Sequence, residues 1–248
     1  SNESTIDADG KVTVTLGNNG VIELKYIDVT VTKVWKDDND AGSFRPDSIK
    51  LTLYRNGTVY ISDFEVGADD CTVTKDSSGN DVWSYTFKGL PYKDGDTYTV
   101  AESAVEFYDT TYSSDTLTVT NTLTAKINPD AVVLDYGKTI SSSPLDNDNG
   151  DFVIDGLTAG EPQKGVNTQD SVKLTYGTAT VDGDNVIYTP TKYMSSIDRV
   201  HYYVSAKSNP TKNSDSSAKL SSTVSFIPAT TVYYEDNFGG EESDGGLY

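Results

Sequence analysis

The sequence contains a single cysteine, Cys71, so it cannot form an internal disulfide. Such a chain is either cytosolic or secreted with some other device that stabilises its fold. Its longest apolar runs, such as residues 131–134, are far shorter than a bilayer span, and no charged-then-apolar leader opens the sequence. We therefore expect a soluble segment that makes no contact with a membrane.

Basic residues are also scarce: 19 Lys and Arg stand against 38 Asp and Glu, for a formal net charge of −19. This charge opposes binding to phosphate backbones, so nucleic acid is not an expected partner. The sequence has one histidine, His201, and lacks a Gly-x-Ser-x-Gly, zinc or phosphate-loop motif. An enzyme acting on an external substrate is therefore disfavoured, although two catalytic carboxylates could be hidden among so many acids.

Helix-favouring Ala and Leu are few, whereas Thr, Ser, Tyr and Val are abundant and 20 glycines are present. This composition favours half-buried strands. At 248 residues, the chain is long enough for about two domains. The sequence predicts an all-β protein with two tandem immunoglobulin-like β-sandwich domains and a short N-terminal hairpin segment.

Alternating strand segments and turn signals divide the chain into four parts. The first is predicted to be a hairpin, with its turn at Asn18-Asn19-Gly20, or the end of a preceding module. The second and third each contain about five short strands, the rhythm of a sandwich. The last is acidic and Gly-rich, which is typical of a partly disordered tail or the start of a next module. The four parts are residues 1–26, 27–124, 125–230 and 231–248.

Three predicted strands of the second part each place one polar residue on their apolar face, because successive side chains of a strand point to opposite faces. The three are Lys33, beside Val31 and Trp35; Glu102, beside Val100; and Asn121, beside Val119. A lone buried charge costs several kcal/mol unless it is paired or neutral. A neutral Lys33 could attack the side-chain carbonyl of Asn121 and release ammonia, with Glu102 as proton shuttle. In the simpler alternative, Lys33 reaches the rim and pairs with Glu102, and Asn121 caps a turn.

Residues 27–124 carry five motifs in an order that resembles the Cna B-type domain, the B repeat of the collagen adhesin found in Gram-positive surface proteins and pilins. The motifs lie at residues 31–35, 45–57, 83–91, 98–102 and 119–122. The resemblance implies a β-sandwich with an autocatalytic Lys–Asn isopeptide bond assisted by a glutamate, and these positions fall on Lys33, Asn121 and Glu102. Ala101 stands where threonine is common.

The resemblance also implies a function, that of a stalk or spacer in a cell-wall-attached, pilin-like adhesin outside the cell. Such a segment is not an enzyme, apart from its single self-directed reaction. The bond would close a loop of about 90 residues between the first and last strands, contributing roughly 4–5 kcal/mol. Expected partners are neighbouring domains of the same protein, and the segment is expected to be monomeric. In the alternative, a tyrosine-rich second domain, with pairs at Tyr202-Tyr203 and Tyr233-Tyr234, binds a host glycan or protein.

Residues 128–227 resemble a bacterial cadherin-like or immunoglobulin-like repeat, through the segments 129–137, 176–190 and 197–204. Asp146, Asp148 and Asp151 alternate in a way that could ligate calcium, as could the acids of residues 37–40, but such runs are usually turns. No cofactor is therefore expected, with calcium at these loops as the alternative. A second isopeptide bond using Lys126 or Lys138 is also left open.

Overall fold

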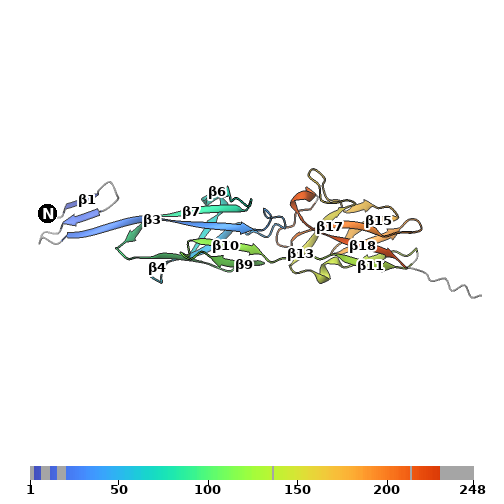
Figure 1. Cartoon of the computed structure of the whole chain (residues 1–248), viewed down its shortest axis with the longest axis horizontal. Coiled ribbons are helices and arrows are strands. Elements are labelled where there is room, and N and C mark those ends of the chain that lie inside the picture. Colours follow the sequence, from blue (N-terminus) through green and yellow to red (C-terminus); the bar gives the residue numbers. More distant parts are fainter. Residues whose placement is uncertain (1–2, 7–11, 16–20, 136, 213, 230–248) are drawn as a thin grey trace, which may run out of the picture.

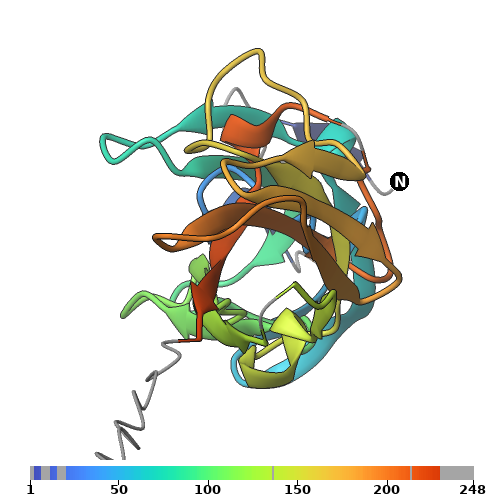
Figure 2. The same ribbon diagram turned by 90° about the vertical axis from the view of Figure 1, so that its right-hand side faces the viewer.

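The structure, a computed structural model, describes residues 3–6, 12–15, 21–135, 137–212 and 214–229. These residues are nearly all β, and they form two sandwiches that follow one another along the long axis of the molecule, with paired strands at the N-terminal end (Figure 1). In the view along that axis the two domains lie one behind the other (Figure 2). The predicted fold class is confirmed. The predicted turn at residues 18–20 and the tail from residue 231 lie outside the described residues.

The N-terminal strands lead directly into the first sandwich. Strand β1 (Glu3–Ile6) pairs with β2 (Val12–Thr15), and β2 pairs antiparallel with the start of β3 (Val21–Lys36). Strand β3 then continues without a break and becomes the centre of the first sheet. It therefore crosses the domain boundary that we expected after residue 26.

The first sandwich has a sheet built around β3, which pairs antiparallel with β7 (Asp81–Tyr92) and parallel with β10 (Thr118–Leu123). Strand β6 (Thr72–Lys75) extends this sheet beside β7, and β9 (Tyr108–Tyr112) extends it beside β10. The facing sheet has the order β5 (Thr58–Gly67), β4 (Ser48–Arg55), β8 (Tyr98–Glu102). Alternate apolar side chains of both sheets form the core, among them Val31, Trp35, Leu53 and Val119.

The second sandwich consists of two four-stranded sheets. One has the order β11 (Asp130–Leu134), β18 (Leu220–Pro228), β17 (Asp198–Ala206), β13 (Phe152–Thr158), and its β11 and β18 are parallel. The other has the order β12 (Ile140–Ser142), β16 (Asn185–Pro190), β15 (Gly177–Asp182), β14 (Ser171–Lys173). The described helices are three short 3₁₀ turns, η1 (Ala68–Asp70), η2 (Pro144–Asn147) and η3 (Ser216–Ala218). Within the described residues, no helix has the length and apolar character needed to cross a membrane.

The loop after β3 contacts the second sandwich directly. The carbonyl of Ala41 accepts a hydrogen bond from Leu220 N at 3.0 Å, and that of Gly42 accepts one from Ala206 N at 2.9 Å. The Phe44 ring packs edge-on against Phe152, with centroids 5.5 Å apart. The linker after β10 is also held to the second domain, because Lys126 and Asn149 exchange two backbone hydrogen bonds. The two domains are thus joined by more than their linker.

Candidate functional site

The three polar residues singled out from the sequence lie in the interior of the first sandwich. Lys33 and Asn121 belong to the neighbouring parallel strands β3 and β10, where Lys33 pairs with Val119 and Asn121 pairs with Trp35. The two therefore sit on the same face, two positions apart along the strands. Glu102 ends β8 in the facing sheet, opposite Leu51 of β4. Amine and carboxamide thus come from one sheet and the carboxyl group from the other.

Lys33 and Glu102 form a buried pair. The side chains are 4% and 0% exposed, and Lys33 Nζ lies 2.8 Å from Oε2 and 2.7 Å from Oε1 of Glu102, of which only Oε2 has hydrogen-bond geometry. The Trp35 ring lies below the amine, 4.5 Å from Nζ to the centroid. Burial lowers the pKa of Lys33 to about 8, although Glu102 acts in the opposite direction. The neutral amine that a nucleophilic attack requires is therefore easier to form at Lys33 than at an ordinary lysine.

Asn121 is fully buried, and its two polar atoms are in different situations. Oδ1 accepts a hydrogen bond from Thr110 Oγ1 at 2.9 Å, and the same hydroxyl lies 3.4 Å from Glu102 Oε2. Nδ2 has no hydrogen-bond partner in the described structure. An unsatisfied buried amide of this kind costs about 1–3 kcal/mol. Loss of Nδ2 would remove that cost.

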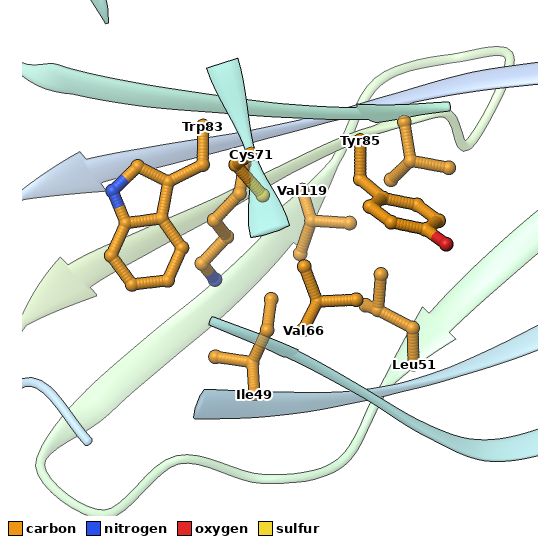
Figure 3. A pocket seen from close by; sticks show the side chains of 9 residues that line it. Ile49, Leu51, Val66, Cys71, Trp83, Tyr85 and Val119 are labelled. Atoms are coloured by element: carbon orange, nitrogen blue, oxygen red, sulfur yellow. The ribbon is translucent and has the colours of Figure 1, made fainter. Parts of the chain in front are cut away.

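The stem of Lys33 runs through apolar surroundings. With side chains of both sheets, including Val66, Trp83 and Val119, it lines a cavity of ≈ 10 Å³ (Figure 3). This volume is at the lower limit for a single water molecule. The setting is therefore nearly dry, which disfavours charge on the amine and strengthens polar contacts at its tip.

Thr110 was not among the residues that sequence reasoning selected. It lies on β9, where its hydroxyl connects Asn121 with Glu102. Strand β9 alternates Tyr108, Thr110 and Tyr112, and this period-two pattern could have indicated the strand. Tyr112 also fixes the end of β8, because its phenol oxygen accepts a hydrogen bond from Glu102 N at 2.9 Å.

The three aspartates that were weak candidates for binding calcium have different surroundings. Asp148 accepts hydrogen bonds from Asn128 N at 2.7 Å and Tyr202 OH at 3.2 Å, and Asp151 lies on the surface, 3.8 Å from Lys207 Nζ. Asp146 lies in η2. No group of three or more His, Cys, Asp or Glu in the described residues is placed to hold a metal ion. Calcium binding stays an untested prediction for this loop, as it does for residues 37–40, where Asp37 binds Arg45.

Asp130, at the start of β11, gives a prediction about pH. Burial, together with the charge of Asp148, raises the pKa of Asp130 to about 6, above that of an unfolded aspartate. Its ionised form is thus disfavoured in the fold, so its contribution to stability is greatest below pH 4 and is lost as the pH rises through 6.

Asp130→Asn should stabilise the chain by about 1 kcal/mol at pH 7.5 and by nothing at pH 3.5, measured by thermal unfolding. The exposed Asp135→Asn is the control, and equal behaviour of the two variants would contradict the assignment.

Two alternatives that the sequence left open for the second domain find no support in the structure. Tyr202 and Tyr203 are fully buried and do not form an exposed platform, while residues 233–234 lie outside the described residues. Lys138 lies on the surface, 3.0 Å from Asp135 Oδ2 with both side chains over 70% exposed, and Lys126 is also exposed. Neither lysine is therefore placed for a second buried cross-link.

The fold and the site together define a class of protein: tandem immunoglobulin-like β-sandwiches, the first of which buries a lysine, a glutamate and an asparagine together. Residues 29–122 match the family model of the Cna protein B-type domain. The match falls on the part of the chain in which the sequence motifs indicated this family. No curated protein sequence matches the chain at a significant level.

Solved structures show a general likeness to the chain. One is a single B repeat unit (B1) of the collagen binding surface protein of Staphylococcus aureus, with 18% identity, a TM-score of 0.32 and coverage of 83% of this chain and 100% of that one. Two B repeat units (B1B2) of the same protein give 18% identity and a TM-score of 0.32, over 90% of this chain and 60% of that one. The pilus adhesin SpaC from Lactobacillus rhamnosus GG gives 13% and 0.29, over 88% and 32%. The chain thus spans only part of the last two.

Proposed function

We propose that this chain is a structural stalk segment of an extracellular, cell-wall-attached bacterial adhesin or pilin-like protein, locked by an isopeptide bond between Lys33 and Asn121. The observation that carries the proposal is the buried contact of Lys33 with Glu102, beside a carboxamide whose Nδ2 has no partner. The match of residues 29–122 to the family model of the Cna protein B-type domain supports it. Neighbouring domains of the same protein are the proposed partners.

The proposed reaction transfers one proton and releases the side-chain nitrogen of Asn121 as ammonia. The neutral amine of Lys33 attacks Cγ of Asn121, so that an Nζ–Cγ bond forms and the Cγ–Nδ2 bond breaks. Glu102 takes a proton from Nζ and delivers it to Nδ2, which leaves as ammonia. Thr110 holds Oδ1 at 2.9 Å, where negative charge develops. The fold supplies the high effective concentration of the reactants.

The position of the bond suits a chain under tension. Strand β3 enters the first sandwich from the N-terminal end, and the parallel β10 leaves it toward the second domain (Figure 1). A pull on the two ends would shear these strands past each other. The bond would carry the load from β3 directly to β10, so the residues between Lys33 and Asn121 could not be extended.

The proposed bond is tested by mass spectrometry of a tryptic digest of the full chain. Trypsin should fail to cleave after Lys33, and the peptide with Lys33 should be joined to the peptide with Asn121, one ammonia lighter than their sum. Glu102→Gln should yield the two peptides separately, because it keeps the shape of the side chain but cannot shuttle the proton. Lys36→Arg, an exposed change on the same strand, is the control and should leave the link intact.

Two results would count against the proposal. Recovery of separate peptides from the wild-type chain would remove the bond and, with it, the load-bearing function. A linked peptide in Glu102→Gln would leave the bond in place but show that the glutamate is not the shuttle. The alternative of a glycan-binding or host-protein-binding surface gains no support from Tyr202 and Tyr203, which lie in the core.

A further inference from the structure

The second sandwich contains a buried lysine–aspartate pair that the sequence did not reveal. Asp155 lies in β13, and Lys219 stands directly before β18. Their side chains are 0% and 3% exposed, and Lys219 Nζ donates a hydrogen bond to Asp155 Oδ2. The amine also contacts the carbonyl oxygen of Thr211 at 2.5 Å and its Oγ1 at 2.6 Å. Ser205, at the end of β17, completes the cluster.

The two oxygens of Asp155 have different partners. Oδ1 accepts hydrogen bonds from Ser205 Oγ at 2.7 Å and from the backbone N–H of Thr211 at 3.2 Å. Oδ2 faces Lys219 and accepts a hydrogen bond from Thr211 Oγ1 at 2.9 Å. Oδ1 thus accepts from two donors that do not contact the amine. Oδ2, by contrast, contacts the amine and the Thr211 hydroxyl, which itself contacts the amine. This asymmetry is what acyl transfer needs: an oxyanion position on one side and a leaving group on the other.

We propose that Asp155 and Lys219 condense to an amide, a second intramolecular cross-link of a different chemical type. A proton first passes from the ammonium to Oδ2, which gives a neutral amine that can attack and a carboxylic acid whose hydroxyl can leave. Nζ then attacks Cγ, the negative charge develops on Oδ1, and the Cγ–Oδ2 bond breaks. Thr211 Oγ1 relays a second proton from Nζ to Oδ2, which leaves as water. No glutamate takes part.

The cross-link would close a loop over a sequence separation of 64 residues. That loop contains β14, β15, β16 and β17, so tension on the parallel end strands β11 and β18 could not extend them. The cross-link would lie next to the junction, the contact between the loop after β3 and the second sandwich, because the following residue, Leu220, donates its N–H to Ala41. The inference does not depend on the bond between Lys33 and Asn121, since it uses other residues and another leaving group.

The full-length chain, digested with trypsin, tests the proposal. The expected product is a peptide pair joined through Asp155 and Lys219, one water lighter than the sum, with no cleavage after Lys219. Lys33→Ala should leave this pair linked, which separates the second reaction from the first. Recovery of the two peptides unlinked from folded wild-type protein, with cleavage after Lys219, would overturn the proposal and leave an ordinary buried ion pair.

Variants of Thr211 test the proton relay. Thr211→Val keeps the shape and the backbone N–H but removes the hydroxyl, so linking should slow by about 100-fold or more. Thr211→Ser keeps the hydroxyl and should link at close to the wild-type rate. Linking is followed by the fraction of joined peptide against time after refolding, with circular dichroism to verify the fold. A wild-type rate in Thr211→Val would overturn the relay.

Discussion

Replacing Asn121 with alanine is expected to lower the free energy of unfolding of the first sandwich by about 4–5 kcal/mol, because without the proposed cross-link the unfolded chain regains the entropy of a loop of about 90 residues. A second contribution adds to this loss, since Lys33 and Glu102 then remain as a buried pair with a cavity beside them. The expected change is a large fraction of the total stability of a domain. It should not depend on reducing agent, because the proposed cross-link is an amide.

Guanidinium denaturation of the full chain measures this effect. Thr122→Ala is the matched control, since Thr122 is exposed on the same strand, next to Asn121. It should shift the midpoint little. If Asn121→Ala unfolds at the same denaturant concentration as Thr122→Ala, the side chain of Asn121 carries no covalent bond.

The inward positions of Lys33, Glu102 and Asn121 could be predicted because strands alternate with a period of two. All three side chains are buried as parity indicated. Their roles in a reaction stay predictions. The parallel pairing of β3 with β10 could not be read from the sequence, because it joins segments far apart in the chain whose partners are chosen by the whole fold.

Asp155 shows where this reasoning fails. Parity in β13 would group it with Val153, away from the buried Phe152 and Ile154. Asp155 lies on that face, because it hydrogen-bonds Ser205, which pairs with Val153. Thr211 and Lys219 cover it there, and parity cannot show that a later segment of the chain buries the outer face. Lys219 lies just outside a strand, where parity has no meaning. The pair therefore became visible only in three dimensions.

Strand β17 shows a second limit. It lies between β13 and β18, and eight of its nine residues are buried. A central strand covered on both faces does not alternate. Tyr202 and Tyr203 are consequently core residues, whereas an amphipathic strand would have exposed one of them.

The loop after β3, which contacts the second sandwich, is held by one buried network of charges. Asp37, fully buried at its side chain, receives two hydrogen bonds from Arg45, at 2.5 and 2.6 Å, and one from Tyr108 OH at 2.9 Å. Arg45 also binds Asp81 at 2.7 Å and lies over the Trp35 ring. This network closes the loop whose residues 41 and 42 bind the second sandwich. The order of the junction therefore depends on Arg45.

Arg45→Ala should accordingly destabilise the first sandwich by about 3–5 kcal/mol, because it leaves Asp37 buried without its cation. The same variant should loosen the junction, so that the amides of Ala206 and Leu220 exchange their hydrogens faster. Denaturant unfolding and hydrogen exchange of the full chain measure the two effects.

Asp37→Asn in the Arg45→Ala background should restore part of the stability, since the amide carries no charge. Lys50→Ala, which removes an exposed ion pair with Glu65, is the control, and a similarly small loss in Arg45→Ala would show that the network does not hold the junction.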